Sequence, residues 1–503
     1  MKNMFLHRLK MYSKIRDDIV ACNFLHESIS YNELENKTNI LAKKIQLALG
    51  FKKQMPVVIY HKRGIEFIEY IIAVLKCGCY YIPLEHNNPI ERVKYIYNDV
   101  NAALIITDLQ DKFESKAYNI ISLDIGENQL QCNFINVKIC ESDLVYVMYT
   151  SGTSGKPKGV KIMYSNLMNL IKSFYFIVYR KFKRPVSVGV MSSFSFDASV
   201  KQIFCSLYYG HTLCIAEDNT RYFGRKIHKF HFVNNLSICD STPSHIKLMT
   251  MQKSKISSEI PFILVGGEIL RWETLHYYIK SVTDKTTFIN VYGPTECCVD
   301  VAYKIITFQE LSDNESGIVP IGNEILNTNL ILRNEYGSTI NDIMIKGELV
   351  ISGKQVGAGY INTLSDAFVY EKGEVLYKTG DIAYYDNDNN LVIVGRKDTQ
   401  VNIRGHRIEL QEVQSVISSY ILNPCVVLLI EYNFSSNLVA FIFSQNFTIE
   451  DSVNLKSYLN LTLPTFMIPS YYIGCLSLPT TNNGKIDEEE LYKTFINYRI
   501  SKP

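Results

Sequence analysis

The chain has 503 residues, of which 47% are hydrophobic and 20% are charged, and its formal net charge is +2. This length predicts two or more domains, and the composition argues against a disordered chain, a nucleic-acid partner and a membrane partner, since no apolar stretch is long enough to span a bilayer. Twelve scattered cysteines without metal-ligand spacing, and a start that lacks the apolar core of a signal peptide, predict reduced thiols and a cytoplasmic location.

Short apolar runs alternate with amphipathic stretches through the first half of the chain. Strands are predicted at 56–60, 80–84 and 102–107, with helices at 66–77 and 89–100 between them. Later come the strand-like segments VSVGVMSS, HTLCIA, LSICDS, FILVGG and FINVYG, several of which end in Gly or Ser before a helix-like segment. This alternation predicts an α/β fold with parallel sheets, in which ligands bind at the carboxyl ends of the strands.

The pattern changes near residue 340. IKGELVISG and LVIVGR resemble antiparallel strands around turn clusters, which predicts a β-barrel-like part of the large domain. The last hundred residues alternate predicted helices and strands and fit a compact α+β unit. We therefore predict a large N-terminal domain over 1–397 and a small C-terminal domain over 398–503.

The segment YTSGTSGKPKGV (149–160) follows the apolar run DLVYVMY. It is not a Walker A loop, because Pro157 follows Gly155-Lys156 where Ser or Thr is required. Its glycines expose backbone N–H groups, and its hydroxyls and lysines add donors and positive charge. The segment therefore predicts a phosphate-binding loop of another kind.

This loop resembles the signature loop of the adenylate-forming enzymes, which include acyl- and aryl-CoA synthetases, luciferases and the adenylation domains of nonribosomal peptide synthetases. The resemblance continues in order along nearly the whole chain, through segments 31–45, 75–99, 291–296, 347–360, 377–381, 395–409, 463–470 and 483–487. So many ordered matches make chance similarity negligible.

The resemblance implies ATP and Mg²⁺ as cofactors and assigns roles to individual residues. Tyr292 is expected to stack on adenine, Asp381 to bind the ribose hydroxyls with Arg396 nearby, and Glu296 to bind Mg²⁺. Thr295 is expected at the phosphate or the substrate carboxylate, and the Lys485 ammonium between that carboxylate and the α-phosphate. The remaining cofactor-binding residues are Thr150, Ser151, Gly152, Thr153, Ser154, Gly155, Lys156, Lys158, Gly266, Gly267, Asn290 and Gly293.

The substrate is indicated by FSFDASVKQIF (194–204), which resembles the segment of amino-acid-activating members whose Asp pairs with the substrate ammonium. Here that residue is Asp197, and a carboxylate facing an apolar acyl chain would be costly. Its alternative role is a helix N-cap. By the same resemblance the pocket is lined by Asp197, Ala198, Lys201, Ser244, Leu264, Gly266, Val291, Val299, Asp300 and Lys485.

This lining resembles that of modules that select glutamate and, less closely, glutamine. Lys201 lies one helical turn after Asp197, so both can face one cavity, and a cation there suits an anionic side chain. Alternatively Lys201 pairs with Asp197 or Asp300, or points to solvent.

We therefore predict a ligase that forms aminoacyl-AMP, with glutamate as the best substrate. It then passes the aminoacyl group to the phosphopantetheine thiol of a separate carrier protein, as its C-terminal domain rotates about Asp398. The chain is expected to be either a free-standing ligase or an excised domain. The alternatives are a D-alanine–carrier protein ligase and an acyl-CoA synthetase; a binding-only pseudoenzyme is disfavoured by Lys485, Asp381 and Glu296.

Overall fold

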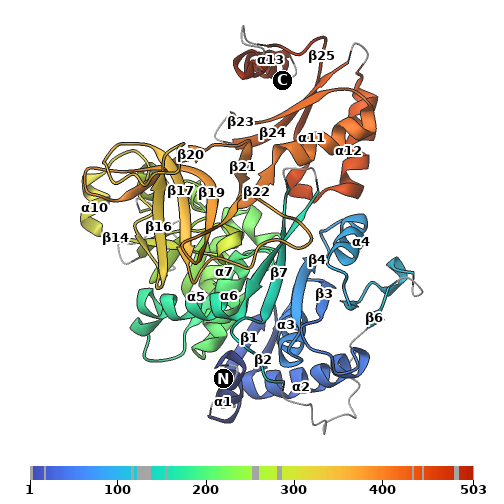
Figure 1. Cartoon of the computed structure of the whole chain (residues 1–503), viewed down its shortest axis with the longest axis vertical. Coiled ribbons are helices and arrows are strands. Elements are labelled where there is room, and N and C mark those ends of the chain that lie inside the picture. Colours follow the sequence, from blue (N-terminus) through green and yellow to red (C-terminus); the bar gives the residue numbers. More distant parts are fainter. Residues whose placement is uncertain are drawn as a thin grey trace. The chain divides into compact units, whose positions relative to one another are not determined.

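The computed structural model describes residues 4–15, 19–114, 118–121, 137–152, 156–251, 260–279, 286–432, 435–444, 447–480 and 486–501. The chain forms two compact units, each with its own hydrophobic core (Figure 1). The first unit consists of Met1–His86, Tyr97–Tyr149 and Gly159–Asp398, and the second of Asn87–Ile96, Thr150–Lys158 and Thr399–Pro503. The second unit thus includes two early segments that the sequence places in the large domain. The hinge at Asp398 stays a prediction.

The largest sheet of the first unit has nine strands. Its central pairs are parallel, and the pairs at its two ends are antiparallel. In sheet order the strands are β15 (Asn323–Glu324), β14 (Ala302–Ile306), β13 (Thr287–Tyr292), β12 (Phe262–Val265), β11 (Leu236–Ser241), β9 (Ser187–Val190), β10 (Thr212–Ile215), β1 (Val20–Phe24) and β2 (Glu27–Ser30). The carboxyl ends of β9, β11, β12 and β13 therefore lie at one edge of this sheet, where ligands bind in α/β folds.

A second sheet has six strands. They are, in order, β6 (Ile120–Ile121), β5 (Leu104–Thr107), β3 (Pro56–His61), β4 (Tyr80–Glu85), β7 (Leu144–Thr150) and β8 (Lys158–Met163). β3 and β4 pair in parallel and are buried along their whole length. Their nearly continuous apolar sequences fit this position, because a parallel sheet is covered on both faces.

Helices connect these strands. They are α1 (Met4–Ile15), α2 (Tyr31–Ala48), α3 (Ile65–Lys76), α4 (Ile90–Asp99), α5 (Tyr164–Ile177), α6 (Ala198–Tyr208), α7 (Gly224–Val233), α8 (Pro243–Thr250), α9 (Trp272–Ile279) and α10 (Phe308–Asp313). α2 begins with a capping box, in which the Ser30 hydroxyl accepts from the Glu33 N–H and the Glu33 carboxylate accepts from the Ser30 N–H. This reciprocal pair fixes the start of the helix.

An antiparallel sheet of five strands completes the first unit. Its strands are β16 (Thr328–Arg333), β17 (Gly347–Gly353), β19 (Glu374–Tyr385), β18 (Phe368–Glu371) and β20 (Leu391–Arg396), which pairs with β19. Asp381 on β19 lies directly opposite Arg396 on β20. The predicted change to antiparallel structure after residue 340 is confirmed.

The C-terminal part of the second unit is an α+β fold. It contains the hairpin β21 (Gln400–Ile403) and β22 (His406–Glu409), the sheet of β23 (Cys425–Tyr432), β24 (Ser435–Phe443) and β25 (Tyr471–Cys475), and helices α11 (Leu410–Ile421), α12 (Ile449–Thr462) and α13 (Glu488–Ser501). Its core joins side chains from α11, α12, β23 and β24.

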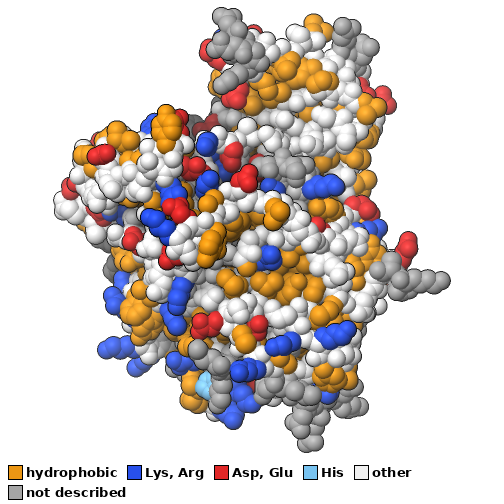
Figure 2. Space-filling view, viewed as in Figure 1, with side chains coloured by type: hydrophobic (Ala, Val, Ile, Leu, Met, Phe, Trp, Pro, Cys, Tyr) orange, Lys and Arg blue, Asp and Glu red, His pale blue; other side chains and the backbone are white. Residues whose placement is uncertain are grey.

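The predicted α/β class is confirmed, and so are the strands and helices predicted between residues 56 and 107. On the face shown in Figure 2, Lys and Arg side chains are interspersed with Asp and Glu, as the small net charge suggests. Among the described residues, no helix has both the length and the apolar character that crossing a membrane requires.

Candidate active site

Three neighbouring parallel strands bring several predicted pocket residues to one edge of the nine-stranded sheet. The register places Asp240 of β11 beside Leu264 of β12, and the next strand, β13, contains Val291. A Cβ atom on Gly266 would lie 2.7 Å from the Val291 carbonyl oxygen. Any larger residue at position 266 would therefore require the backbone to move, which explains the glycine.

Asp197 immediately precedes α6 and occupies its N-cap position, but no side-chain hydrogen bond caps the helix. Its carboxylate instead accepts a hydrogen bond from the Thr295 side chain. Burial raises the pKa of Asp197 to about 6, the Thr295 hydrogen bond lowers it, and Asp300 and Glu296 add to the rise. The carboxylate also accepts from the Ala198 N–H, at the first residue of α6, and this contact lowers its pKa as well, but the hydrogen bond of a helix cap is not made. An ionised Asp197 is therefore a group that gains from a cationic ligand.

Lys201, one turn further along α6, is 3% exposed. Its Nζ lies 2.7 Å from a carboxylate oxygen of Asp300 and 2.7 Å from one of Asp240, and 4.9 Å from the centre of the Phe174 ring. Burial alone would lower the pKa of Lys201, but the two carboxylates outweigh it, and the pKa is raised above its ordinary value. The solvent-facing alternative is excluded, and the ion pair with Asp300 is present.

A strained turn positions Asp300. The Asp300 N–H donates to the Cys298 carbonyl at 3.2 Å, and Val299 between them has φ +78°. A β-branched residue rarely adopts this backbone region, and such strain is common at functional sites. The turn fixes the backbone before Asp300, and the place of Val299 in the substrate pocket stays a prediction.

A second polar cluster surrounds Asp381. The Tyr292 hydroxyl donates to one carboxylate oxygen of Asp381, and Arg396 Nη1 donates to the other at 2.6 Å. Arg396 also binds both carboxylate oxygens of Asp398, at 2.7 and 2.8 Å. Burial and the Asp381 carboxylate raise the pKa of Tyr292 well above its ordinary value, so the hydroxyl stays a donor. The three residues predicted to meet adenine and ribose are therefore joined in one network.

Other predicted residues have additional structural roles. The Asn290 amide donates to the carbonyls of Val319 and Pro320, at 3.3 and 2.8 Å. Gly267 has φ +79°, and a Cβ atom on Gly293 would lie 2.2 Å from the Val299 carbonyl oxygen. These glycines allow a close approach of backbone segments at the edge of the sheet.

A model of one protein family, described as AMP-binding enzyme, matches residues 12–361. The chain belongs to this family. Zwittermicin A synthase ZmaJ of Bacillus cereus is 34% identical over 501 residues, which cover 94% of this chain and 92% of that protein. Bacitracin synthase 1 of Bacillus licheniformis is 34% identical over 487 residues, which cover 94% of this chain and 9% of that protein.

Among solved structures, the Vibrio cholerae adenylation domain AlmE, in complex with glycyl-adenosine-5'-phosphate, matches with a TM-score of 0.83 at 23% identity. The match covers 99% of this chain and 98% of that chain, and it establishes the shared fold. PA1221, a nonribosomal peptide synthetase protein containing adenylation and PCP domains, has the same fold, with a TM-score of 0.82 at 21% identity. This chain spans only 9% and 14% of the first two curated relatives, bacitracin synthase 1 and surfactin synthase subunit 1.

Most of the phosphate loop predicted for this AMP-binding enzyme, Thr150–Lys158, belongs to the second unit. The Ser151 hydroxyl accepts from the Glu409 N–H at 3.0 Å and donates to the Arg407 carbonyl at 3.1 Å. The Gly152 N–H donates to a carboxylate oxygen of Glu412 at 3.2 Å, and that carboxylate also pairs with Arg92. In this conformation the Glu412 carboxylate accepts the hydrogen bond of a backbone N–H group of the kind that binds phosphate.

Glu296 is buried and accepts a hydrogen bond from the Tyr360 hydroxyl at 2.7 Å. In the part of the chain that the structure describes, no group of three or more His, Cys, Asp or Glu residues could hold a metal ion. One carboxylate fits Mg²⁺ in an AMP-binding enzyme, because this ion is typically bound by one or two carboxylates together with substrate phosphates.

Some predicted residues lie outside the described residues, namely Thr153, Ser154, Gly155 and Lys485. Ser244 lies in α8, where its hydroxyl donates to Glu268 at 2.8 Å. Its place in the pocket stays a prediction.

Asp240, the second partner of Lys201, was not predicted from the sequence. Its place in LSICDS, at the carboxyl end of a predicted strand, was the available signal.

Proposed function

We propose that this AMP-binding enzyme activates an amino acid by reaction with ATP, giving aminoacyl-AMP and pyrophosphate. The observation that carries the proposal is Asp197: a carboxylate near the head of the pocket whose pKa is about 6 and which does not cap its helix. A substrate ammonium would offset the cost of its burial. An acyl-CoA synthetase of fatty acids would leave this charge uncompensated.

In the proposed reaction, an oxygen of the substrate carboxylate attacks the α-phosphorus of ATP. The bond from that phosphorus to the bridging oxygen breaks, and pyrophosphate leaves with the electron pair. The family resemblance assigns Lys485 to neutralise the charge that builds up at the α-phosphate, with Thr295 binding nearby. The Tyr292, Asp381 and Arg396 network is proposed to hold the adenosine. Mg²⁺, with Glu296 as its protein ligand, would screen the phosphate charges.

For the substrate side chain we propose glutamate, with glutamine second. A lysine ammonium has three N–H donors, and Asp240 and Asp300 accept from two directions. A third donor can bind a carboxylate or an amide oxygen of the substrate. Because two protein carboxylates already offset the lysine charge, we expect only a moderate preference for glutamate. A small apolar substrate such as alanine would leave this buried ion cluster without a ligand.

The second half-reaction is proposed to transfer the aminoacyl group to the phosphopantetheine thiol of a carrier protein. The thiolate would attack the acyl carbon, and AMP would leave. We propose that the two predicted domains, 1–397 and 398–503, rotate relative to one another about Asp398 between the two steps. A test is loading of a phosphopantetheinylated carrier protein by wild type and by Asp398→Pro, whose adenylation activity serves as the control.

The substrate is tested by ATP–pyrophosphate exchange with a panel of the twenty common amino acids and D-alanine. Glutamate is expected to lead, followed by glutamine; a leading D-alanine would overturn the pocket assignment. Lys201→Met is then assayed with glutamate and with glutamine in the same preparation, so any loss of folded protein cancels. We expect kcat/KM to fall at least about tenfold more for glutamate, and equal losses would refute the charge pairing.

A further inference from the structure

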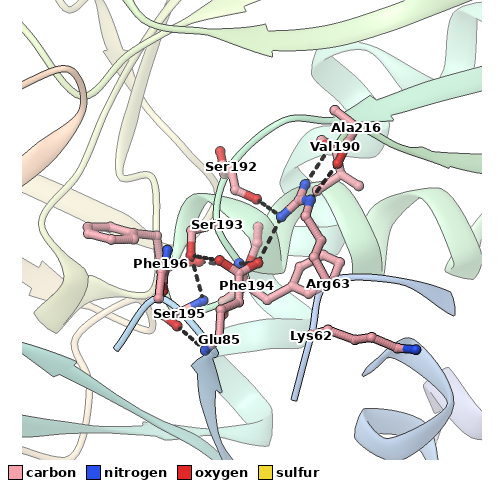
Figure 3. A network of polar contacts seen from close by, with 12 residues as sticks. Lys62, Arg63, Glu85, Val190, Ser192, Ser193, Phe194, Ser195, Phe196 and Ala216 are labelled. Atoms are coloured by element: carbon pink, nitrogen blue, oxygen red, sulfur yellow. Dashed lines mark hydrogen bonds and ion pairs between the residues drawn. The ribbon is translucent and has the colours of Figure 1, made fainter. Parts of the chain in front are cut away.

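The segment between β9 and α6, residues 191–196, leads directly to Asp197. It contacts two buried charged residues, Arg63 and Glu85, which come from the six-stranded sheet region of the first unit (Figure 3). Arg63 follows β3, and Glu85 is the last residue of β4. Their side chains are 2% and 3% exposed, and Arg63 Nη1 lies 3.0 Å from Glu85 Oε1. We call this pair and its bonds the Arg63–Glu85 clamp.

Arg63 holds the backbone on the β9 side of the segment. Its Nη2 donates to the Val190 carbonyl at 2.7 Å, and its Nη1 donates to the Ser192 carbonyl at 2.8 Å. Its Nε donates to the Ala216 carbonyl at 2.6 Å, at the end of the neighbouring strand β10. The planar guanidinium thus binds three carbonyls at once, of which that of Val190 also accepts from the Ala216 N–H at 3.0 Å. Its Cζ lies 4.4 Å from the centre of the Phe194 ring.

Glu85 holds the part of the segment nearer to Asp197. Its Oε1 accepts from the Phe194 N–H at 3.0 Å, and its Oε2 accepts from the Ser193 hydroxyl. Its own backbone N–H donates to the Ser195 hydroxyl at 2.9 Å. Figure 3 shows the carboxylate and the serines turned toward one another across the segment.

From this segment, two short links reach α6. The Phe196 N–H donates to the Ser193 carbonyl at 3.0 Å, and the Ser199 hydroxyl donates to the Phe196 carbonyl at 2.6 Å. Asp197 therefore lies between a clamped segment and the first turn of a helix. Any movement of residues 193–196 would change the position of its carboxylate.

We propose that Arg63 and Glu85 are positioning residues for the ammonium subsite, holding Asp197 where the substrate nitrogen binds. This inference rests on the proposed function, in which Asp197 pairs with the amino group. Neither residue touches the substrate. A displacement of about 1 Å at a reacting group can reduce a rate about a hundredfold, so a remote clamp has a measurable effect.

The test compares Glu85→Gln with a matched control, Glu35→Gln. Both substitutions remove the charge from a buried ion pair, because Glu35 on α2 pairs with buried Lys76 at 2.8 Å. Glu85→Gln keeps the size of the side chain and an oxygen acceptor, but removes the carboxylate charge that lies in direct contact with Arg63. Ser193→Ala serves as a milder variant in case Glu85→Gln does not fold. ATP–pyrophosphate exchange gives separate KM values for the amino acid and for ATP.

We expect Glu85→Gln to raise the KM for the amino acid at least about tenfold, with the KM for ATP changed less than about threefold. Glu35→Gln should lower thermal stability similarly and leave both KM values near wild type. Equal increases in both KM values in Glu85→Gln, or reduced stability with unchanged KM, would overturn the positioning role.

If the wild type shows no pyrophosphate exchange with any amino acid, the proposed function is refuted, but the clamp is not. The clamp is then judged by amide hydrogen exchange of peptides covering 191–197. Faster exchange in Glu85→Gln than in Glu35→Gln would support it, and equal exchange would refute it.

Discussion

Asp197→Asn is expected to stabilise the free protein at neutral pH while it removes activity. The pKa of Asp197 is raised to about 6 from an ordinary 3.8, mainly by burial. At about 1.4 kcal/mol per pKa unit, this rise corresponds to about 3 kcal/mol of stability that ionised Asp197 costs the folded protein. Asparagine keeps the shape and the hydrogen bond from Thr295 without the charge. In the proposed function, a substrate ammonium offsets this cost in the wild type.

The direction in which this stability difference changes with pH follows from proton binding. Between pH 4 and 6 the Asp197 carboxyl binds more protons in the folded protein than in the unfolded chain, so its own contribution to stability falls as pH rises. The advantage of Asp197→Asn should therefore be absent near pH 4, grow through pH 6 and reach about 2–3 kcal/mol at pH 8. Urea unfolding of both proteins at pH 4, 5, 6, 7 and 8 measures this difference in the free energy of unfolding, and the same unfolding transition is compared at each pH.

Two results would refute this reasoning. One is a variant no more stable than wild type at pH 8, which would mean that the Asp197 carboxylate is well solvated or already paired. The other is a stability gain of equal size at pH 4 and pH 8, which would mean that its origin is packing and not ionisation. Pyrophosphate exchange by the same variant should fall at least about a hundredfold with the preferred amino acid.

Three further predictions concern the nucleotide side of the site. Tyr292→Phe removes the hydrogen bond to Asp381 and should raise the KM for ATP about fivefold, with the KM for the amino acid unchanged, in steady-state exchange. Gly152→Ala should reduce exchange more than about a hundredfold because its Cβ would lie 1.9 Å from the Lys156 carbonyl oxygen; near-normal activity would show that the loop has another active conformation. Lys485→Ala should abolish exchange with an unchanged circular dichroism spectrum, and exchange at the wild-type rate would exclude its role.

The sequence predicted the strands from local patterns, and a family resemblance brought Tyr292, Asp381 and Arg396 together as one group, whose binding of the nucleotide stays a prediction. LSICDS and FINVYG show strand periodicity within six residues, and Tyr292, Asp381 and Arg396 each stand in a recognisable motif. The pairing of Asp381 with Arg396 then follows from a hairpin register. The predicted strands are therefore found in the structure, and the hairpin register brings Asp381 and Arg396 opposite one another.

The clamp and Asp240 were not predicted because they depend on sheet order. β9 lies between β10 and β11, so Val190 and Ala216, on strands separated by a helix, come within reach of one guanidinium. Neither Arg63 nor Glu85 stands in a sequence motif that indicates ligand binding. Contacts across more than a hundred residues appear only when the strand order is known.

The clamp has a consequence for protein engineering. A chimera that transplants the stretch 187–300, which contains most of the proposed amino-acid pocket, into another AMP-binding enzyme would leave Arg63 and Glu85 behind, because both precede it in the chain. The recipient would then have to supply an equivalent guanidinium and carboxylate at its own first parallel sheet. Grafts that also carry residues 56–85 should keep their amino-acid selectivity more often than grafts of the shorter stretch.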